Sequence, residues 1–274
     1  MIRGDAMTQQ QILRDRCAIV FGGAGTMGAA VAREFVAQGA EVFLAGRNRA
    51  NVEAHAQRIA KAGGRAEAAT VDTLDDTAIN SYVDGIVKRT GRIDIVLDAA
   101  GPLAREYGNG KNAVDLPIEE FMVPLETMVR SRFITARAAA RHMIAQRSGV
   151  IIFVTGSPAR PHVPGGTAIG AAFRAIENLT ENLAFEVSPH GVRVVCLRTL
   201  ANIDSRSIQD TMDILASQLH ISRDEAIAQI ARSNFLKVSA TVQDTANAVV
   251  LLASDRARML TGTVVNATAG AALD

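Results

Sequence analysis

The sequence has little of what disulfide-bonded, nucleic-acid-binding and membrane proteins depend on. It contains no tryptophan, two tyrosines and two cysteines among 274 residues. Both cysteines, Cys17 and Cys196, fall in predicted buried strands, which argues against a disulfide framework and favours a reducing, cytoplasmic setting. A net charge of +1 offers no strong attraction to nucleic acid or to an anionic membrane. The expected partner is therefore a small-molecule substrate.

Long apolar segments and metal-binding clusters are missing as well. No apolar run reaches the roughly 20 residues that a membrane-spanning helix needs, and no cluster of residues has the spacing of metal ligands. Residues 1–11 are polar and lack the apolar stretch of a signal peptide, so we expect a tail before one domain of residues 12–274. An apolar content of 48% is enough for a substantial core.

The sequence does contain an alternation of predicted strands and helices. Several of the strands are almost continuously apolar, which is typical of parallel strands covered on both faces. We expect strands at 17–21, 41–46, 65–71, 93–99, 149–155, 192–197 and 264–267, and helices at 27–38, 51–62, 75–90, 124–146, 167–187 and 243–253. Pro124 suits the first turn of its helix. This pattern predicts an α/β protein with a doubly wound parallel sheet, a Rossmann fold, of about seven strands.

A glycine-rich stretch, residues 20–28, lies between the first predicted strand and the first predicted helix. Gly23, Gly25 and Gly28 fit the pattern G-x-G-x-x-G, whose glycines permit a tight turn, a close approach to a pyrophosphate and packing of helix on strand. The start of the helix would offer free N–H groups to the phosphates. The alternative is an ordinary glycine turn. We predict a dinucleotide site formed by Gly22, Gly23, Gly25, Thr26, Met27 and Gly28.

The end of the second predicted strand indicates which dinucleotide is bound. The chain continues there as Arg47–Asn48–Arg49, and no carboxylate is present to hold the 2′-hydroxyl of NAD. Arg47, beside Asn48, could instead hold a 2′-phosphate with its planar set of donors; the alternative is a solvated helix start. Asp72, after the third strand, could accept a hydrogen bond from adenine or cap the next helix. We predict NADP rather than NAD.

Two irregular stretches follow predicted strands at their carboxyl ends, where ligands lie in open α/β sheets. Residues 101–116 carry several glycines, and residues 204–240 contain two predicted short helices, 205–217 and 222–233. Ordinary surface connections would have the same composition. We expect the second stretch to form a helical substrate lid.

Motifs spread over nearly the whole chain resemble the short-chain dehydrogenase/reductase family. They include the glycine loop, Asp72, Ala99–Ala100–Gly101, Ser188–Pro189–His190–Gly191 and Leu260–Thr261–Gly262. The resemblance implies a seven-stranded parallel sheet and a nicotinamide cofactor bound in part by Ala99, Ala100 and Gly101. It also implies a homo-oligomer, a dimer or a tetramer, built on the long fourth and fifth helices.

The sequence departs from this family at the reaction centre. The family uses a Tyr as general acid/base, a Lys four residues later and an Asn on the preceding helix. Alignment on residues 181–186 places Ile169, Phe173 and Met128 at these three positions, and none of them can donate or accept a proton. Ile169 and Phe173 are expected to form an apolar patch, since they are four residues apart on a helix. Thr26 also replaces a glycine of the usual loop.

Three polar residues remain as candidate catalytic residues. Ser157 stands where the resemblance implies a carbonyl-polarising serine. His162 could protonate an alkoxide or enolate near neutral pH, although a surface histidine would have the same sequence setting. Tyr107 and Lys111 have the Tyr–Lys spacing of the family, but two glycines between them disfavour a helix.

Two main functional hypotheses follow from these observations. The first is an NADP-dependent oxidoreductase with an atypical proton donor, in which the cofactor carries out the hydride transfer. The second is a nucleotide-binding protein without redox chemistry, acting as a sensor, scaffold or partner subunit, which the joint loss of Tyr, Lys and Asn favours. A weaker third possibility is that nucleotide no longer binds. The resemblance and the glycine loop favour the first, with tyrosine-dependent carbonyl reduction absent or slow.

Overall fold

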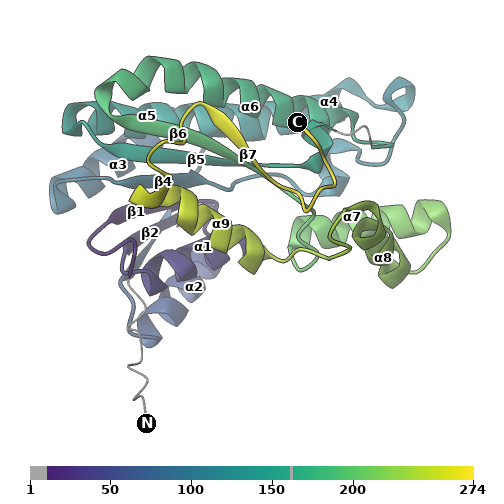
Figure 1. Ribbon diagram of the computed structural model, residues 1–274, viewed down its shortest axis with the longest axis horizontal. Coiled ribbons are helices and arrows are strands. Elements are labelled where there is room, and N and C mark those ends of the chain that lie inside the picture. Colours follow the sequence, from purple (N-terminus) through teal and green to yellow (C-terminus); the bar gives the residue numbers. More distant parts are fainter. Residues whose placement is uncertain (1–10, 161–162) are drawn as a thin grey trace, which may run out of the picture.

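A parallel sheet with helices on both faces forms the centre of the protein (Figure 1). The computed structural model describes residues 11–160 and 163–274, and within them the sheet has seven strands in the order β3-β2-β1-β4-β5-β6-β7. These are β1 (Cys17–Phe21), β2 (Glu41–Gly46), β3 (Ala66–Thr70), β4 (Ile95–Asp98), β5 (Gly149–Gly156), β6 (Val192–Thr199) and β7 (Thr263–Ala267). The predicted doubly wound α/β sheet is confirmed.

The helices divide between the two faces of the sheet. One face carries α1 (Thr26–Ala37), α2 (Arg49–Lys61) and α9 (Val242–Ala253), and the other carries α3 (Asp76–Thr90), α5 (Arg130–Gln146) and α6 (Thr167–Val187) (Figure 1). Each layer has its own apolar cluster. In β1, Ile19 and Phe21 belong to one cluster and Ala18 and Val20 to the other, because successive side chains of a strand point to opposite faces.

The fourth helix departs from the prediction at its start. It begins at Ile118 rather than at Pro124, and Pro124 is the last residue of α4 (Ile118–Pro124). A π turn, Leu125–Val129, follows before α5 begins. Proline has no N–H for the helical ladder, and the helix widens directly after it. The expectation that Pro124 starts the helix is therefore wrong, and the wide turn places Met128 at its inner side, where it is buried.

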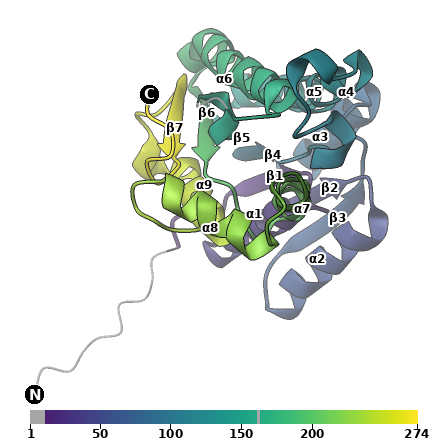
Figure 2. The same ribbon diagram turned by 90° about the vertical axis from the view of Figure 1, so that its right-hand side faces the viewer.

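Two helices lie at the end of the sheet, away from both layers. They are α7 (Arg206–Leu219) and α8 (Arg223–Ser233), and Figure 2 shows them in front of the strands. Ser205 and Ser222 cap them by accepting hydrogen bonds from Ile208 N and Glu225 N. The two helices predicted in residues 204–240 are thus present, and their action as a lid stays a prediction.

No helix in the described ranges combines the length and the apolar character that crossing a membrane would require.

Candidate functional site

A cavity of about 1750 Å³ opens at the carboxyl ends of the strands. It is bordered by the glycine loop, by the ends of β4 and β5, and by α7. In an open α/β sheet, ligands bind in this crevice, at the point where the strand order reverses. Here the order reverses between the neighbouring strands β1 and β4. From β1 the sheet continues to β2 on one side, and from β4 it continues to β5 on the other side.

Close packing of backbone explains two of the glycines in the loop. Gly22 has φ +77°, and a Cβ there would lie 2.6 Å from Ala100 N. A Cβ on Gly28 would lie 2.5 Å from Gly22 O. Neither contact leaves room for a side chain, so both glycines are needed to bring β1, α1 and the end of β4 together.

The start of α1 faces the same cavity with unpaired donors. Its N-cap is Gly25, which has no side chain to accept from the first turn. The first N–H to join the helical ladder is that of Ala29, which bonds to Gly25 O at 3.0 Å. Thr26 and Met27 border the cavity just ahead of it. Free N–H groups at a helix start form a site for an anion such as a phosphate.

The three residues that follow β2 have different roles. Asn48 accepts a hydrogen bond from Asn51 N at 3.0 Å and so caps α2. Arg49 pairs with Glu53 on its own helix at 2.7 Å. Arg47 borders the cavity and joins no ion pair within the described residues. It is therefore Arg47 whose guanidinium is available to a ligand.

Asp72 has a local structural role. Its Oδ1 accepts from Leu74 N at 3.0 Å, and the cap of α3 is Asp75, which accepts from Ala78 N. The neighbours Val71 and Thr73 border the cavity. The alternative that Asp72 caps α3 is wrong, and a contact between Asp72 and adenine stays a prediction.

An apolar wall faces the end of β5. Met128, Ile169 and Phe173 all border the cavity and belong to one apolar cluster. A Cβ on Gly156 would be 3.0 Å from the Phe173 ring, and one on Gly101 would be 3.5 Å from Met128 Cε. The apolar patch predicted for Ile169 and Phe173 is present on α6, and the π turn adds Met128 to it.

Ser157 is the candidate catalytic residue that directly follows β5. Its Oγ donates to Thr199 O at 3.2 Å, and the residue borders the cavity. His162 lies outside the described residues. The role predicted for either residue therefore rests on its place in the sequence.

Tyr107 is buried where the segment after β4 meets α7. It ends the 3₁₀ turn Ala104–Tyr107, and only 7% of it is exposed. Burial, together with the charge of Asp210, raises the pKa of Tyr107 to about 12. Lys111 pairs with Glu120 at 2.7 Å instead. The two residues do not form a Tyr–Lys pair, as the glycines between them led us to expect.

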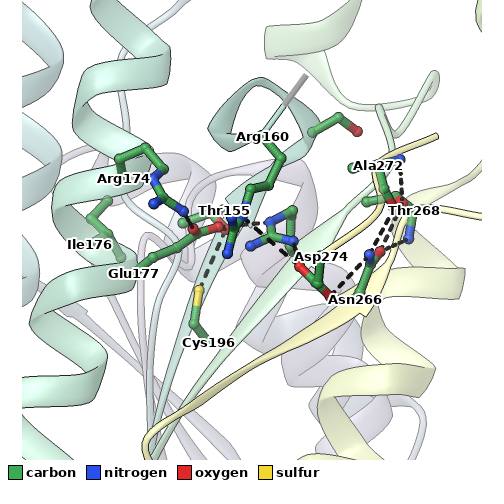
Figure 3. A network of polar contacts seen from close by, with 12 residues as sticks. Thr155, Arg160, Arg174, Ile176, Glu177, Cys196, Asn266, Thr268, Ala272 and Asp274 are labelled. Carbon is green, nitrogen blue, oxygen red and sulfur yellow. Dashed lines mark hydrogen bonds and ion pairs between the residues drawn. The ribbon is translucent and has the colours of Figure 1, made fainter. Parts of the chain in front are cut away.

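A buried ionic network fixes α6 to the sheet behind the cavity (Figure 3). Arg198 on β6 is completely buried and donates to Glu177 Oε1 at 2.8 Å, and it also pairs with Asp274. Thr155 and Arg174 complete the hydrogen bonds of Glu177. Because Ile169 and Phe173 lie on α6, the network holds the apolar wall in place.

We expect Glu177→Gln to lower the free energy of unfolding by about 3 kcal/mol, because it leaves the Arg198 charge buried with less compensation. Urea unfolding at 25 °C measures the change. The matched control is Glu53→Gln, which breaks the exposed Arg49–Glu53 pair and should cost less than about 1 kcal/mol. Equal effects of the two substitutions would contradict the structural role of the network.

A second buried arginine, Arg132, was missed by the sequence reasoning. It lies on α5 with 2% exposure, and its Nη1 donates to Ala100 O at 2.9 Å and to Met128 O at 3.1 Å. Asp98 is fully buried beside it and accepts from Ala100 N and Thr135 Oγ1. The helical pattern gives no signal for this arrangement, because α5 carries several other arginines that are less buried.

In the ranges 11–160 and 163–274, no three His, Cys, Asp or Glu side chains come together in a way that could hold a metal ion.

The strand order, the glycine loop and the cavity at the switch point define a Rossmann-fold α/β protein. A family model described as "Enoyl-(Acyl carrier protein) reductase" matches residues 22–272. The chain belongs to the short-chain dehydrogenase/reductase family of oxidoreductases.

Curated relatives and solved structures agree with this assignment. The short-chain reductase protein NovJ of Streptomyces niveus is 28% identical over 97% of both chains. The 4-formylbenzenesulfonate dehydrogenase TsaC1/TsaC2 of Comamonas testosteroni is 29% identical over 94% of this chain and 98% of the relative. A crystal structure of NAD+-bound xylitol dehydrogenase shares the fold, with a TM-score of 0.86, 22% identity and coverage of 93% of this chain and 98% of that one.

Proposed function

We propose that this protein is an NADP(H)-dependent oxidoreductase that acts on a small organic substrate with a proton donor other than the family's tyrosine. The observation that carries the proposal is the cradle itself. Gly22 and Gly28 admit no Cβ, and the uncapped start of α1 faces the cavity. The names of the curated relatives, dehydrogenases and reductases, favour an enzyme over a binding protein without chemistry.

The residues at the cavity fit a dinucleotide. The N–H groups of Thr26, Met27 and Gly28 would hold the pyrophosphate, and Arg47 would hold the 2′-phosphate. Ala99, Ala100 and Gly101, after β4, would border the nicotinamide riboside. When bound, the cofactor supplies the hydride or accepts it. A similar fold is seen in actinorhodin polyketide ketoreductase with NADPH, at a TM-score of 0.86 and 19% identity.

The apolar wall suggests the class of substrate. Met128, Ile169 and Phe173 exclude water from the side of the cavity next to Ser157 and offer no proton. A polarised C=C or C=N bond needs less help from an acid than a carbonyl does. We therefore propose an enone- or imine-type double bond as the group that reacts. Ser157 would be its hydrogen-bond donor once its O–H turns from Thr199 O to the substrate, and Tyr107 or His162 are further candidates.

The cofactor proposal is tested by isothermal titration of NADPH and NADH. We expect NADPH to bind at least about tenfold more tightly, since only its 2′-phosphate can use Arg47. Equal affinities would remove the basis for NADP. Absence of binding by either dinucleotide would remove the proposed function.

The substrate proposal is tested by a screen of NADPH oxidation with enones, imines, aldehydes and ketones. We expect simple aldehydes and ketones to react at least about 10²-fold more slowly than the best enone or imine, because a positioned acid/base group contributes about 10²–10⁴-fold. The double variant Ile169→Tyr, Phe173→Lys should raise ketone reduction. Fast reduction of simple ketones by the unaltered protein would contradict the proposal, and an unchanged rate in His162→Ala would exclude His162.

We also propose a homo-oligomer, a dimer or a tetramer, built on α5 and α6. These helices expose the large apolar side chains Phe133 (48%) and Phe185 (85%). Light scattering after size-exclusion chromatography should give a multiple of 29.0 kDa, and Phe185→Glu should reduce the mass. A monomeric mass for the unaltered protein would contradict this expectation.

A further inference from the structure

Arg132 places a positive charge at the floor of the cavity. It lies on α5, three residues after Val129, the last residue of the π turn. It borders the cavity although only 2% of its surface is exposed. Its Nη1 is held by two backbone oxygens, Ala100 O at 2.9 Å and Met128 O at 3.1 Å. Backbone carbonyls fix the position of the guanidinium without neutralising it.

No carboxylate pairs with this guanidinium. Among the described residues Arg132 is in no ion pair within 4.0 Å, and its buried Nε has no hydrogen-bond partner. Burial lowers the pKa of Arg132, and the charge of Asp98 opposes that effect. An arginine still stays protonated in a protein.

Asp98 does not line the cavity, although Arg132 does. Its oxygens accept hydrogen bonds from Ala100 N at 2.8 Å, from Thr135 Oγ1 at 3.1 Å and from Ser131 Oγ. Arg132 borders the cavity and Asp98 is completely buried. The positive end of this pair of buried charges therefore faces the space where a ligand would lie.

The position of Arg132 relative to the strands of the sheet identifies the part of the ligand that it would face. Ala100 follows β4, on the far side of the switch point from β2 and Arg47. A dinucleotide binds across the switch point, with one nucleotide on each side. If Arg47 holds the adenosine side, Arg132 lies under the nicotinamide side, next to β5 and Ser157.

We propose that Arg132 makes this site select the reduced form of its dinucleotide. The inference rests on the proposed function. The nicotinamide ring is neutral when reduced and carries one positive charge when oxidised, and the rest of the molecule is the same in both forms. A fixed, buried positive charge repels only the oxidised ring, and it does so strongly because little water screens it. A site with this preference loads NADPH and releases NADP+, which suits reduction as the working direction.

The test is the ratio of the two dissociation constants, Kd for NADP+ divided by Kd for NADPH, measured by titration calorimetry. We expect a ratio of at least about ten in the unaltered protein, the size of a charge–charge interaction of one to a few kcal/mol at intermediate dielectric. Arg132→Gln keeps a hydrogen-bond donor but removes the charge, and it should bring the ratio close to one. Arg132→Lys keeps the charge and should retain most of the ratio.

A matched control is Arg130→Met, which removes an exposed arginine two residues away on the same helix. It should leave the ratio unchanged. Adenosine 2′,5′-bisphosphate has no nicotinamide and should bind equally to all of the variants, which reports that the adenosine side is intact. A second readout is the reduction potential of the bound couple, which should fall by about 30 mV for each tenfold loss of the ratio.

Several outcomes would overturn the inference. One is a ratio near one in the unaltered protein, and another is an equal loss of both dinucleotides and the bisphosphate in Arg132→Gln, which is the mark of a purely structural role. If Arg132→Gln does not fold, the affinity of the unaltered protein for a tetrahydronicotinamide analogue of NADP, whose ring is neutral, is measured instead. An affinity like that for NADP+ would overturn the inference. An affinity like that for NADPH would support it. Failure of every dinucleotide to bind would overturn the proposed function itself.

Discussion

Gly25→Ala is expected to weaken NADPH binding by at least about 100-fold and to leave the fold unchanged. Gly25 is the N-cap of α1 with φ −89°, a conformation open to any residue, and the nearest atom to a Cβ there would be Gly22 O at 3.3 Å. A shift of a few tenths of an ångström at Gly22 O accommodates the methyl group. A pyrophosphate cannot, because the glycine lets backbone and phosphate approach closely. Titration calorimetry measures the affinity, and urea unfolding measures the stability.

Gly22→Ala is the contrasting variant. Its φ of +77° and the approach of 2.6 Å to the backbone at Ala99 and Ala100 predict a loss of stability of several kcal/mol, about 1–3 kcal/mol from the backbone conformation alone. Gly85→Ala serves as the control, since nothing lies within 4 Å of a Cβ on this exposed residue of α3. It should gain about 0.5–1 kcal/mol from helix propensity. Normal NADPH affinity in folded Gly25→Ala would contradict the placement of the pyrophosphate.

Arg47→Ala is expected to weaken NADPH binding by about 10–100-fold and to leave NADH binding unchanged. A charged hydrogen bond to a phosphate contributes about 1.5–3 kcal/mol, and Arg47 is free of ion pairs in the described part of the chain. NADH lacks the 2′-phosphate, so its affinity provides the internal reference. The affinity for NADPH should also decrease with salt, because the site is exposed.

Arg49→Ala is the matched control for this prediction. Arg49 carries the same charge two residues later but pairs with Glu53 on α2. We expect its loss to change the NADPH affinity by less than about threefold. A larger effect from Arg49 than from Arg47 would show that the phosphate lies elsewhere.

Arg47 and Arg132, two of the arginines that line the cavity, have different proposed roles. Arg47 is exposed at the end of β2 and is proposed to recognise a group that both redox forms of NADP share. Arg132 is buried, and we propose that it discriminates between the redox forms. The salt dependence of binding separates the two arginines experimentally, because salt screens an exposed charge much more than a buried one.

Local sequence patterns were sufficient for most of the fold. Strands such as β1 and β2 and the helix α6 have the predicted bounds, because continuous apolar runs and a helical period are properties of neighbouring residues. The glycine loop was found for the same reason. The start of α4 was not, since Pro124 is compatible both with a first helical turn and with the residue before a π turn.

The candidate site was predictable where its residues are consecutive or where the family resemblance assigns their positions. The sequence by itself determined the dinucleotide cradle, the absence of an acid after β2 and the apolar character of Met128, Ile169 and Phe173. The tertiary structure alone decided that Tyr107 is buried against α7 and that Arg132 is directed to the backbone carbonyl of Ala100 beside the cavity. Burial and partners depend on contacts between residues far apart in the chain, and no local pattern records them.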